Sequence, residues 1–280
     1  MKKLIFLLFI LYPAMSWGAN YYVLDGGTSS TCTSWSDACD QLSDANALVS
    51  RGDTIYVGDG SYNAVIFNTP TSGTSLITIR KATGADHGTD AGWDSSYGDG
   101  QAVFSPGMQF CEGYYNFDGV TGGGPGNWGS GHGFRISAGT QYEYGMLVLA
   151  DHWGNCGSRN SITNVVISHV EFQANNDWSQ PIHAVEPGYR IDNVTLEYLY
   201  IHGCNRAHIM TNATNINNWL LQYSYFYKSS TDPSHHFASF RIDAGENITI
   251  RHNIFEDVSS TGCIGNYGSA NDVKIYGNVF

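Results

Sequence analysis

Residues 164–172 read NVVISHVEF, and four later segments align with them without a gap: 193–201 (NVTLEYLYI), 218–226 (NWLLQYSYF), 247–255 (NITIRHNIF) and 272–280 (DVKIYGNVF). Their starts are separated by 29, 25, 29 and 25 residues. The second and fourth positions are always apolar, an alternation typical of a strand with one buried face. The ninth position is always large and apolar, which predicts a second short strand after a bend.

A repeat of this length that contains strands and no helical pattern is typical of one coil of a β-solenoid. Each coil covers the apolar end of its neighbour, and equivalent residues stack in columns. The first residue of each repeat is Asn, or Asp in the last repeat, and both tolerate the left-handed backbone of a tight bend. Asn193 and Asn247 also begin N-x-T sequons, but Asn recurs in this column where no sequon exists. We therefore expect a structural asparagine column.

The N-terminus reads MKKLIFLLFILYPAMSWG, with two lysines, an apolar run from Leu4 to Leu11 and small residues near its end. This order predicts a signal peptide over residues 1–18, whose apolar run is too short to span a bilayer. Residues 19–280 then form one β-helix domain of a secreted or periplasmic protein. Because the chain stops at Phe280 inside a repeat, we expect this domain to be truncated at its C-terminus.

The charge of the chain limits its partners. The formal net charge is -12, and loss of Lys2 and Lys3 with the signal peptide leaves 11 basic against 25 acidic residues, or -14. Such a surface repels nucleic acid and anionic membranes. It also repels acidic polysaccharides, unless local basic residues or a bound cation screen the approach. No later stretch is apolar enough for a membrane span.

Six cysteines follow the signal peptide, and an even number in an oxidising compartment permits three disulfides. Cys32 and Cys39 are the only two that are close enough in sequence for their pairing to be predicted. No C-x-x-C spacing is present, which disfavours a metal site built on these thiols.

Upstream of the repeats, a predicted helix behind Ser36 has one apolar face, formed by Ala38, Leu42, Ala45 and Val49. The segments YYVLDGG (21–27), GDTIYVGDGSY (52–62) and SLITIRKATG (75–84) alternate as strands do. Together with the repeats, these segments resemble the pectate-lyase-like superfamily of right-handed parallel β-helix proteins over nearly the whole mature chain.

The resemblance implies an all-β fold, a single-stranded right-handed parallel β-helix with a short N-terminal capping helix. Residues 84–160 are rich in Gly, Asp, Trp and Tyr, and we expect early coils with long side loops there, with one strand-like piece at 114–120. The superfamily includes polysaccharide lyases, glycoside hydrolases, pectin esterases and non-catalytic surface proteins, so fold alone does not transfer an activity.

By fold analogy, the leading hypothesis is an exported carbohydrate-active protein that acts as a polysaccharide lyase on an acidic glycan. One alternative is a non-catalytic extracellular or cell-surface β-helix protein, an adhesin or a glycan-binding protein. Another is a glycoside hydrolase, which needs two carboxylates across the glycosidic bond. Glu186 and Asp243 are the pair that the sequence offers for that role.

Segments 181–188, 206–213 and 237–245 lie between the repeats and are predicted to be consecutive strands of one sheet. His183 and His208 each precede the core residue of the next repeat by eleven positions, so we expect them to stack on adjacent coils. A lyase needs a base for the proton beside a uronate carboxylate and a cation for that carboxylate. We therefore predict the catalytic residues Arg206, His208, Arg241 and His183, and the substrate-binding residues Glu186, His202, Asp243 and Trp178.

Two further observations bear on this assignment. The sequence contains no adjacent Asp-Asp pair of the kind seen in polygalacturonase-like hydrolases, and Lys228 and Lys274 are the only lysines in the repeats. Polar residues that alternate along a strand are also explained as solvated outward side chains.

Calcium is compatible with the abundant carboxylates, but no ligand spacing identifies a metal site. Sugar-stacking platforms are expected at the loop tryptophans Trp93, Trp128, Trp153 and Trp178.

Overall fold

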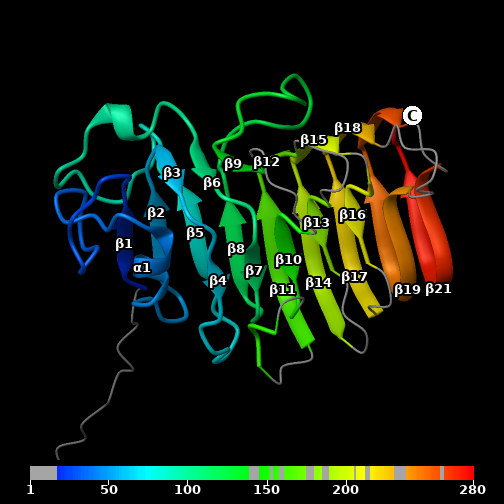
Figure 1. Cartoon of the computed structure of the whole chain (residues 1–280), viewed down its shortest axis with the longest axis horizontal. Coiled ribbons are helices and arrows are strands. Elements are labelled where there is room, and N and C mark those ends of the chain that lie inside the picture. Colours follow the sequence, from blue (N-terminus) through cyan, green and yellow to red (C-terminus); the bar gives the residue numbers. More distant parts are fainter. Residues whose placement is uncertain are drawn as a thin grey trace, which may run out of the picture.

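The computed structural model describes residues 18–138, 145–151, 154–157, 161–174, 180–184, 189–204, 206–211, 215–229, 238–258 and 262–280. Over this part the chain winds into one elongated stack of parallel coils (Figure 1). Of the predicted signal peptide, residues 1–17 lie outside the described residues. No helix in the described part is long and apolar enough to cross a bilayer.

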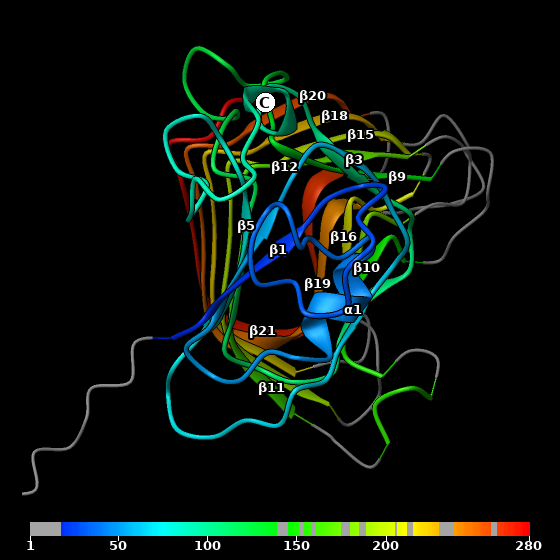
Figure 2. The same ribbon diagram turned by 90° about the vertical axis from the view of Figure 1, so that its left-hand side faces the viewer.

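The coils have three faces, which are visible when the solenoid is viewed along its axis (Figure 2). The first face consists of β1 (Asn20–Val23), β2 (Thr54–Val57), β5 (Ile77–Lys81), β8 (Tyr115–Asp118), β11 (Ser161–Ser168), β14 (Arg190–Glu197), β17 (Asn215–Gln222) and the C-terminal parts of β19 (Ala238–Arg251) and β21 (Gly262–Tyr276). The second consists of β3 (Gly60–Tyr62), β6 (Ala102–Phe104), β9 (Phe134–Ser137), β12 (Val170–Gln173), β15 (Tyr200–Cys204), β18 (Tyr225–Ser229) and β20 (Ile254–Val258). The third consists of β4 (Ile66–Phe67), β7 (Met108–Phe110), β10 (Leu147–Leu149), β13 (Ile182–His183), β16 (Ile209–Met210) and the N-terminal parts of β19 and β21.

The five repeats stack in the register that their gapless alignment predicts. Val165 pairs with Val194, and Val194 pairs with Trp219 on the next coil. The column continues through Ile248 to Val273. After a bend, the ninth positions form a column on the second face, where Phe172, Ile201, Phe226 and Phe255 are buried and pair in sequence. All these ladders are parallel, so the predicted parallel β-helix is confirmed, and it is the architecture that the superfamily resemblance implies.

The predicted asparagine column is present at the bend inside the first-face strands. Asn164, Asn193, Asn218, Asn247 and Asp272 all have φ between 50° and 58°. The amide of Asn218 donates to the side-chain oxygen of Asn193 over 3.1 Å, and the amide of Asn247 donates to Asn218 in the same way. Because these bonds satisfy the side chains from coil to coil, the column stabilises the bend, as expected from the sequence.

The N-terminal helix is shorter than predicted. α1 spans Leu42–Asn46 and begins after Gln41 instead of Ser36. The reason is that the backbone of Cys39 pairs with β1, donating to Tyr22 O over 3.0 Å, and therefore cannot join the helix. The predicted apolar face is still buried, and α1 covers the N-terminal end of the solenoid (Figure 2).

Two disulfides are present in the described part. Cys32 is bonded to Cys39, which confirms the predicted pair. A second bond joins Cys111, directly after β7, to Cys156, which lies between β10 and β11. This second pair is 45 residues apart in sequence, and only the stacking of coils brings the two thiols together. Cys204 and Cys263 are free thiols.

The early coils contain more strands than the sequence indicated. Besides β8, which corresponds to the piece expected at 114–120, residues 84–160 contribute β6, β7, β9, β10 and the short 3-10 helix η1 (Ser95–Tyr97). Strands of three or four residues show too few alternations to be recognised from polarity. Their apolar residues, such as Phe104, Phe110 and Phe134, are fully buried and continue the core toward the N-terminus.

Candidate functional site

The three segments predicted to form consecutive strands do so, because β13 pairs with β16 and β16 pairs with β19. Their register differs from the prediction, however. His183 pairs with Met210, and Met210 pairs with Arg241. One turn of the solenoid therefore contains more residues when it is counted along the third face than along the first face. His183 and His208 consequently do not stack on each other. The expectation of a stacked histidine pair is wrong for this reason.

His208 is buried among core side chains. Its ring meets Phe226 edge-on at 5.5 Å, its Nδ1 lies 2.9 Å from Ser239 Oγ, and none of the side chain is exposed. Burial lowers the pKa of His208 to about 3, so the imidazole is neutral at physiological pH. Arg206 is also largely buried, at 9% exposure. The sequence suggested that these two residues belong to an open polar patch. Their burial shows that they do not.

Arg241 is held on the third face by its neighbours. Its Nε lies 3.1 Å from Asp243 Oδ1, and its guanidinium lies over the Tyr267 ring at 4.9 Å from the centroid. The predicted residues Glu186 and Trp178, and the loop tryptophan Trp153, lie outside the described residues. Of the predicted site residues that the structure describes, His183 and Arg241 lie in strands of the third face, and Asp243 follows in β19 where the register shifts.

His202 lies on β15, which belongs to the second face, away from the other predicted residues. Its Nε2 is 3.0 Å from Glu171 Oε1, and Glu171 lies on the preceding coil in β12. The other carboxylate oxygen of Glu171 accepts a hydrogen bond from Gln101 over 3.1 Å. Glu171 of this pair also lines a cleft.

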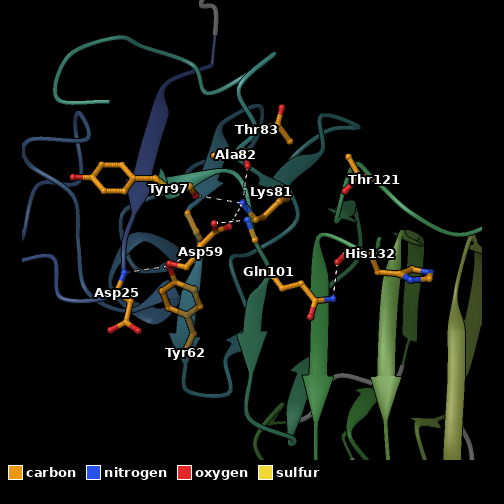
Figure 3. A network of polar contacts seen from close by, with 12 residues as sticks. Asp25, Asp59, Tyr62, Lys81, Ala82, Thr83, Tyr97, Gln101, Thr121 and His132 are labelled. Carbon is orange, nitrogen blue, oxygen red and sulfur yellow. Dashed lines mark hydrogen bonds and ion pairs between the residues drawn. The ribbon is translucent and has the colours of Figure 1, made fainter. Parts of the chain in front are cut away.

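A cleft of about 590 Å³ opens beside this pair. It lies between the turn at residues 98–101 and the glycine-rich loop at residues 121–131, and its lining includes Lys81, Gln101, His132 and Glu171. Figure 3 shows the polar contacts that meet there. A cleft with several convergent polar groups is where a ligand site is expected.

The floor of the cleft is formed by a buried ion pair. Lys81 Nζ lies 2.6 Å from Asp59 Oδ1 and donates to Ala82 O over 2.6 Å and to Tyr97 O over 3.4 Å (Figure 3). Burial lowers the pKa of Lys81, although the hydrogen bond to Asp59 acts in the opposite direction. With 1% of its side chain exposed and its three donors used, Lys81 anchors the turn and is not accessible to a polymeric substrate.

His132 forms one side of the cleft and is also buried. Its backbone carbonyl accepts a hydrogen bond from Gln101 Nε2 over 2.7 Å, and its ring Nε2 lies 3.1 Å from Tyr198 O. Because a carbonyl can only accept, Nε2 carries the hydrogen, and the lone pair is on Nδ1. Burial lowers the pKa of His132 to about 4, so the ring remains neutral.

The accessible acid–base pair of the cleft is Glu171 with His202. Their side chains are 16% and 20% exposed. Burial acts to raise the pKa of Glu171, but the hydrogen bonds from His202 and Gln101 outweigh it and hold the pKa below its ordinary value. The carboxylate is therefore ionised at neutral pH, and by accepting the Nε2 hydrogen it leaves Nδ1 of His202 as the basic nitrogen.

Cationic and aromatic side chains flank this pair on the outward side of the second face. Arg135 on β9 pairs in register with Glu171, and its charge helps to lower the pKa of Glu171. Tyr200 pairs in register with Glu171 on the other side and stacks on His202 with ring centroids 4.2 Å apart. Tyr225 stacks on Tyr200 at 5.2 Å. The face thus offers a base, a cation and a row of tyrosine rings.

Sequence analysis found His202 but missed Glu171, Arg135 and the tyrosine row. Glu171, Tyr200 and Tyr225 each occupy the eighth position of a repeat, directly before the buried ninth position. Since neighbours along a strand point to opposite sides, that position must face outward, and this alternation was the available signal. Among the described residues, no group of three His, Cys, Asp or Glu side chains is arranged to hold a metal ion.

The solved structures that are similar to this chain include two lyases. The crystal structure of pectate lyase Pel9A is 12% identical, with a TM-score of 0.47, and the match covers 94% of this chain and 78% of that one. The structure of the PL6 family alginate lyase AlyGC is 14% identical, with a TM-score of 0.34, and the match covers 96% of this chain and 41% of that one. No protein-family model and no curated protein sequence matches the chain. The architecture of the chain follows from its own strand pairing.

Proposed function

We propose that this protein is an exported polysaccharide lyase that cleaves a uronate-containing glycan on the second face of the solenoid. The observation that carries the proposal is the imidazole of His202, which is 20% exposed and is held by the Glu171 carboxylate on the preceding coil. A base fixed by a carboxylate, with a cation on the strand beyond that carboxylate, matches what β-elimination requires. The base role is assigned to His202 instead of His208, because His208 is fully buried.

In the proposed reaction Arg135 pairs with the substrate carboxylate and stabilises the negative charge that develops when the neighbouring proton leaves. His202 Nδ1 removes the proton from C5 of the uronate. The C4–C5 double bond forms as the C4–O4 bond breaks, and the departing oxygen takes up a proton. No water is added and no oxidant is needed, so the step balances with one unsaturated and one ordinary chain end.

Tyr200 is the proposed proton donor to the departing oxygen. Its ring stacks on His202, and burial together with the charge of Glu171 raises the pKa of its hydroxyl. The hydroxyl therefore stays protonated at neutral pH. The tyrosine row formed by Tyr200 and Tyr225 also provides flat apolar surface along the direction in which a glycan would lie.

Export is supported by two observations. The N-terminal sequence has the order of a signal peptide, and two disulfides are present in the described part of the chain. Disulfides form and persist in oxidising compartments. We therefore propose a secreted or periplasmic location, where polymeric glycans are accessible.

A glycoside hydrolase is the second candidate, because the carboxylate-bearing residues Asp99 and Glu171 both line the cleft. A hydrolase adds water across the glycosidic bond and leaves no double bond. The two activities therefore differ in their products, and a single assay can separate them.

The test is absorbance at the wavelength of unsaturated uronates while the purified mature protein is incubated with alginate, pectate and chondroitin sulfate, with and without calcium. A rise with one glycan supports the lyase and identifies its substrate. New reducing ends without a rise in absorbance would replace the lyase by the hydrolase. Neither signal on any of these glycans would refute cleavage of these acidic glycans and favour a glycan-binding or adhesive role.

A further inference from the structure

The glycine-rich loop beside the cleft is held in one position by its contacts with Tyr198. A Cβ atom on Gly124 would lie 2.9 Å from the Tyr198 ring, and one on Gly123 would lie 2.5 Å from Tyr198 O. The loop also closes on itself, because Gly123 N donates to Asn127 O over 3.1 Å and Thr121 Oγ1 donates to Gly131 O over 3.0 Å. Glycine is required here, since any side chain would push the loop off the solenoid.

The loop presents Trp128 to a second hollow. This hollow has a volume of about 360 Å³ and is lined by Trp128, Pro125, Tyr223, His252 and Ile254, with the chain near Val279 at its edge. Trp128 is half-buried. Tyr223 and His252 stack on each other with ring centroids 5.4 Å apart, so the opposite wall is formed by a stable aromatic pair. Among the described residues, no carboxylate, lysine or arginine lines this hollow.

The hollow and the cleft lie along the same face of the solenoid, the second face. From Glu171 on β12, the second face continues through β15 and β18 to β20, which carries Ile254. Three strand spacings of about 4.8 Å place the hollow roughly 14 Å along the axis from the acid–base pair. Tyr200 and Tyr225 lie between them, and a Cβ atom on Gly129 would lie 3.5 Å from each of the two rings. One loop thus borders the cleft at Gly131 and the hollow at Trp128.

We propose that the hollow at Trp128 is a distal subsite that binds the apolar face of one pyranose ring, a few sugar residues away from the bond that is cleaved. The proposal rests on the proposed function, because the same glycan chain is to occupy both places. The face of a pyranose chair that carries axial C–H groups fits an apolar hollow walled by aromatic rings. A tryptophan offers the largest aromatic surface for this contact. The pinned loop places Trp128 in advance, so little conformational entropy is lost on binding.

The chemistry of the lining distinguishes this subsite from the cleft. In the cleft, Arg135 is to attract the uronate carboxylate, and that attraction weakens as salt screens it. In the hollow, the part of the chain that the structure describes contributes no carboxylate, lysine or arginine, so the contribution of Trp128 should not change with ionic strength. The subsite is therefore expected to sense the length and ring shape of the glycan and not its charge.

The closing experiment compares wild type, Trp128→Ala and Trp128→Phe on oligosaccharides of the cleaved glycan, from disaccharide to octasaccharide. We expect Trp128→Ala to lower kcat/KM roughly 10-fold on the long chains and not on the shortest cleavable ones. Trp128→Phe should retain most of the activity, and the 10-fold difference should be the same at low and high salt. An equal loss at every length, or no loss at any length, would overturn the subsite.

A binding arm separates failure of the subsite from failure of the proposed function. Tryptophan fluorescence of the same three proteins is titrated with alginate, pectate, chondroitin sulfate and a neutral xylan, and the melting temperature confirms that each variant is folded. A Trp128-dependent change with a glycan, when none of the four glycans is cleaved, supports the subsite and counts against the lyase. Cleavage without any Trp128-dependent change supports the lyase and refutes the subsite.

Discussion

Two pairs of a nitrogen base and a carboxylate meet the same cleft, one through Lys81 and the other through Glu171, and their nitrogen bases differ in exposure. Lys81 and Asp59 form the floor, where 1% and 19% of their side chains are exposed. Glu171 lines the wall and His202 lies behind it on the second face, with 16% and 20% of their side chains exposed. Burial lowers the pKa of Lys81, but its three donors are taken by Asp59, Ala82 and Tyr97. A perturbed pKa therefore marks a structural anchor in the first pair, whereas access to solvent makes the second pair available for chemistry.

The largest expected effect is on catalysis. Replacement of His202 by Ala removes the proposed base, and the initial rate of unsaturated uronate release should fall by roughly 10²–10⁴-fold. Glu171→Gln should lower the rate less, because the imidazole remains but loses the carboxylate that orients it. The measurement is the rate on the identified glycan, with His87→Ala in the segment between β5 and η1 as a control that should retain activity. An unchanged rate in His202→Ala would remove this residue from the mechanism.

The next effect is on stability and tests the floor of the cleft. Asp59→Ala leaves the Lys81 ammonium buried with only carbonyl partners, and loss of one partner of a buried pair costs about 3–5 kcal/mol of unfolding free energy. Lys81→Met should cost less, since Asp59 keeps some contact with solvent and the hydrogen bond from Gly100 N. Urea denaturation of both variants measures the difference. If Asp59→Ala were as stable as wild type, the pair would not anchor the turn.

A smaller effect concerns pH. The pKa of buried His132 is about 4 in the folded protein, against about 6.5 in an unfolded chain. Between these values the unfolded state binds a proton that the folded state does not, so the free energy of unfolding falls as the pH falls through this window. From pH 7 to pH 5 this group alone removes about 2 kcal/mol.

The matched variant is His132→Gln, whose amide can still donate to Tyr198 O. Urea denaturation at pH 7 and pH 5 should show a smaller loss of stability on acidification in this variant than in wild type. His208, whose pKa is about 3, contributes in the same direction and is unchanged in both proteins. Equal losses in the two proteins would mean that His132 is not kept neutral by burial.

The smallest effect concerns the asparagine column. Asn218→Ala removes two side-chain hydrogen bonds and places a residue without an amide at φ 55°. Because both bonds are exposed, we expect a loss of about 1–2 kcal/mol, most of it from the left-handed backbone. Asn218→Gly should lose less, since glycine adopts this conformation freely. If the two variants were equally stable, the left-handed backbone at residue 218 would not contribute to the loss of unfolding free energy.

The bends show how far the sequence could be read. The sixth position of the repeats holds His169, Tyr198, Tyr223 and His252, all with φ between 50° and 56°. Their rings form a column, with His169 stacked on Tyr198 at 4.7 Å and Tyr198 on Tyr223 at 5.4 Å. The alignment contained this column, but tyrosine is not typical of left-handed bends, so it was not predicted as the asparagine column was.

The sequence by itself determined the solenoid, its register over five coils, the asparagine column and the Cys32–Cys39 bond. These follow from local periodicity and short separations, which a linear pattern records directly. The tertiary structure alone decided which polar residues meet. Strand pairing moved His183 out of register with His208, burial removed His208 from solvent, and Glu171 reached His202 across 31 residues. Contacts between coils depend on the lengths of the intervening loops, and the exposure of a residue depends on what those loops cover. The sequence of the repeat alone therefore predicts neither the contacts nor the exposure.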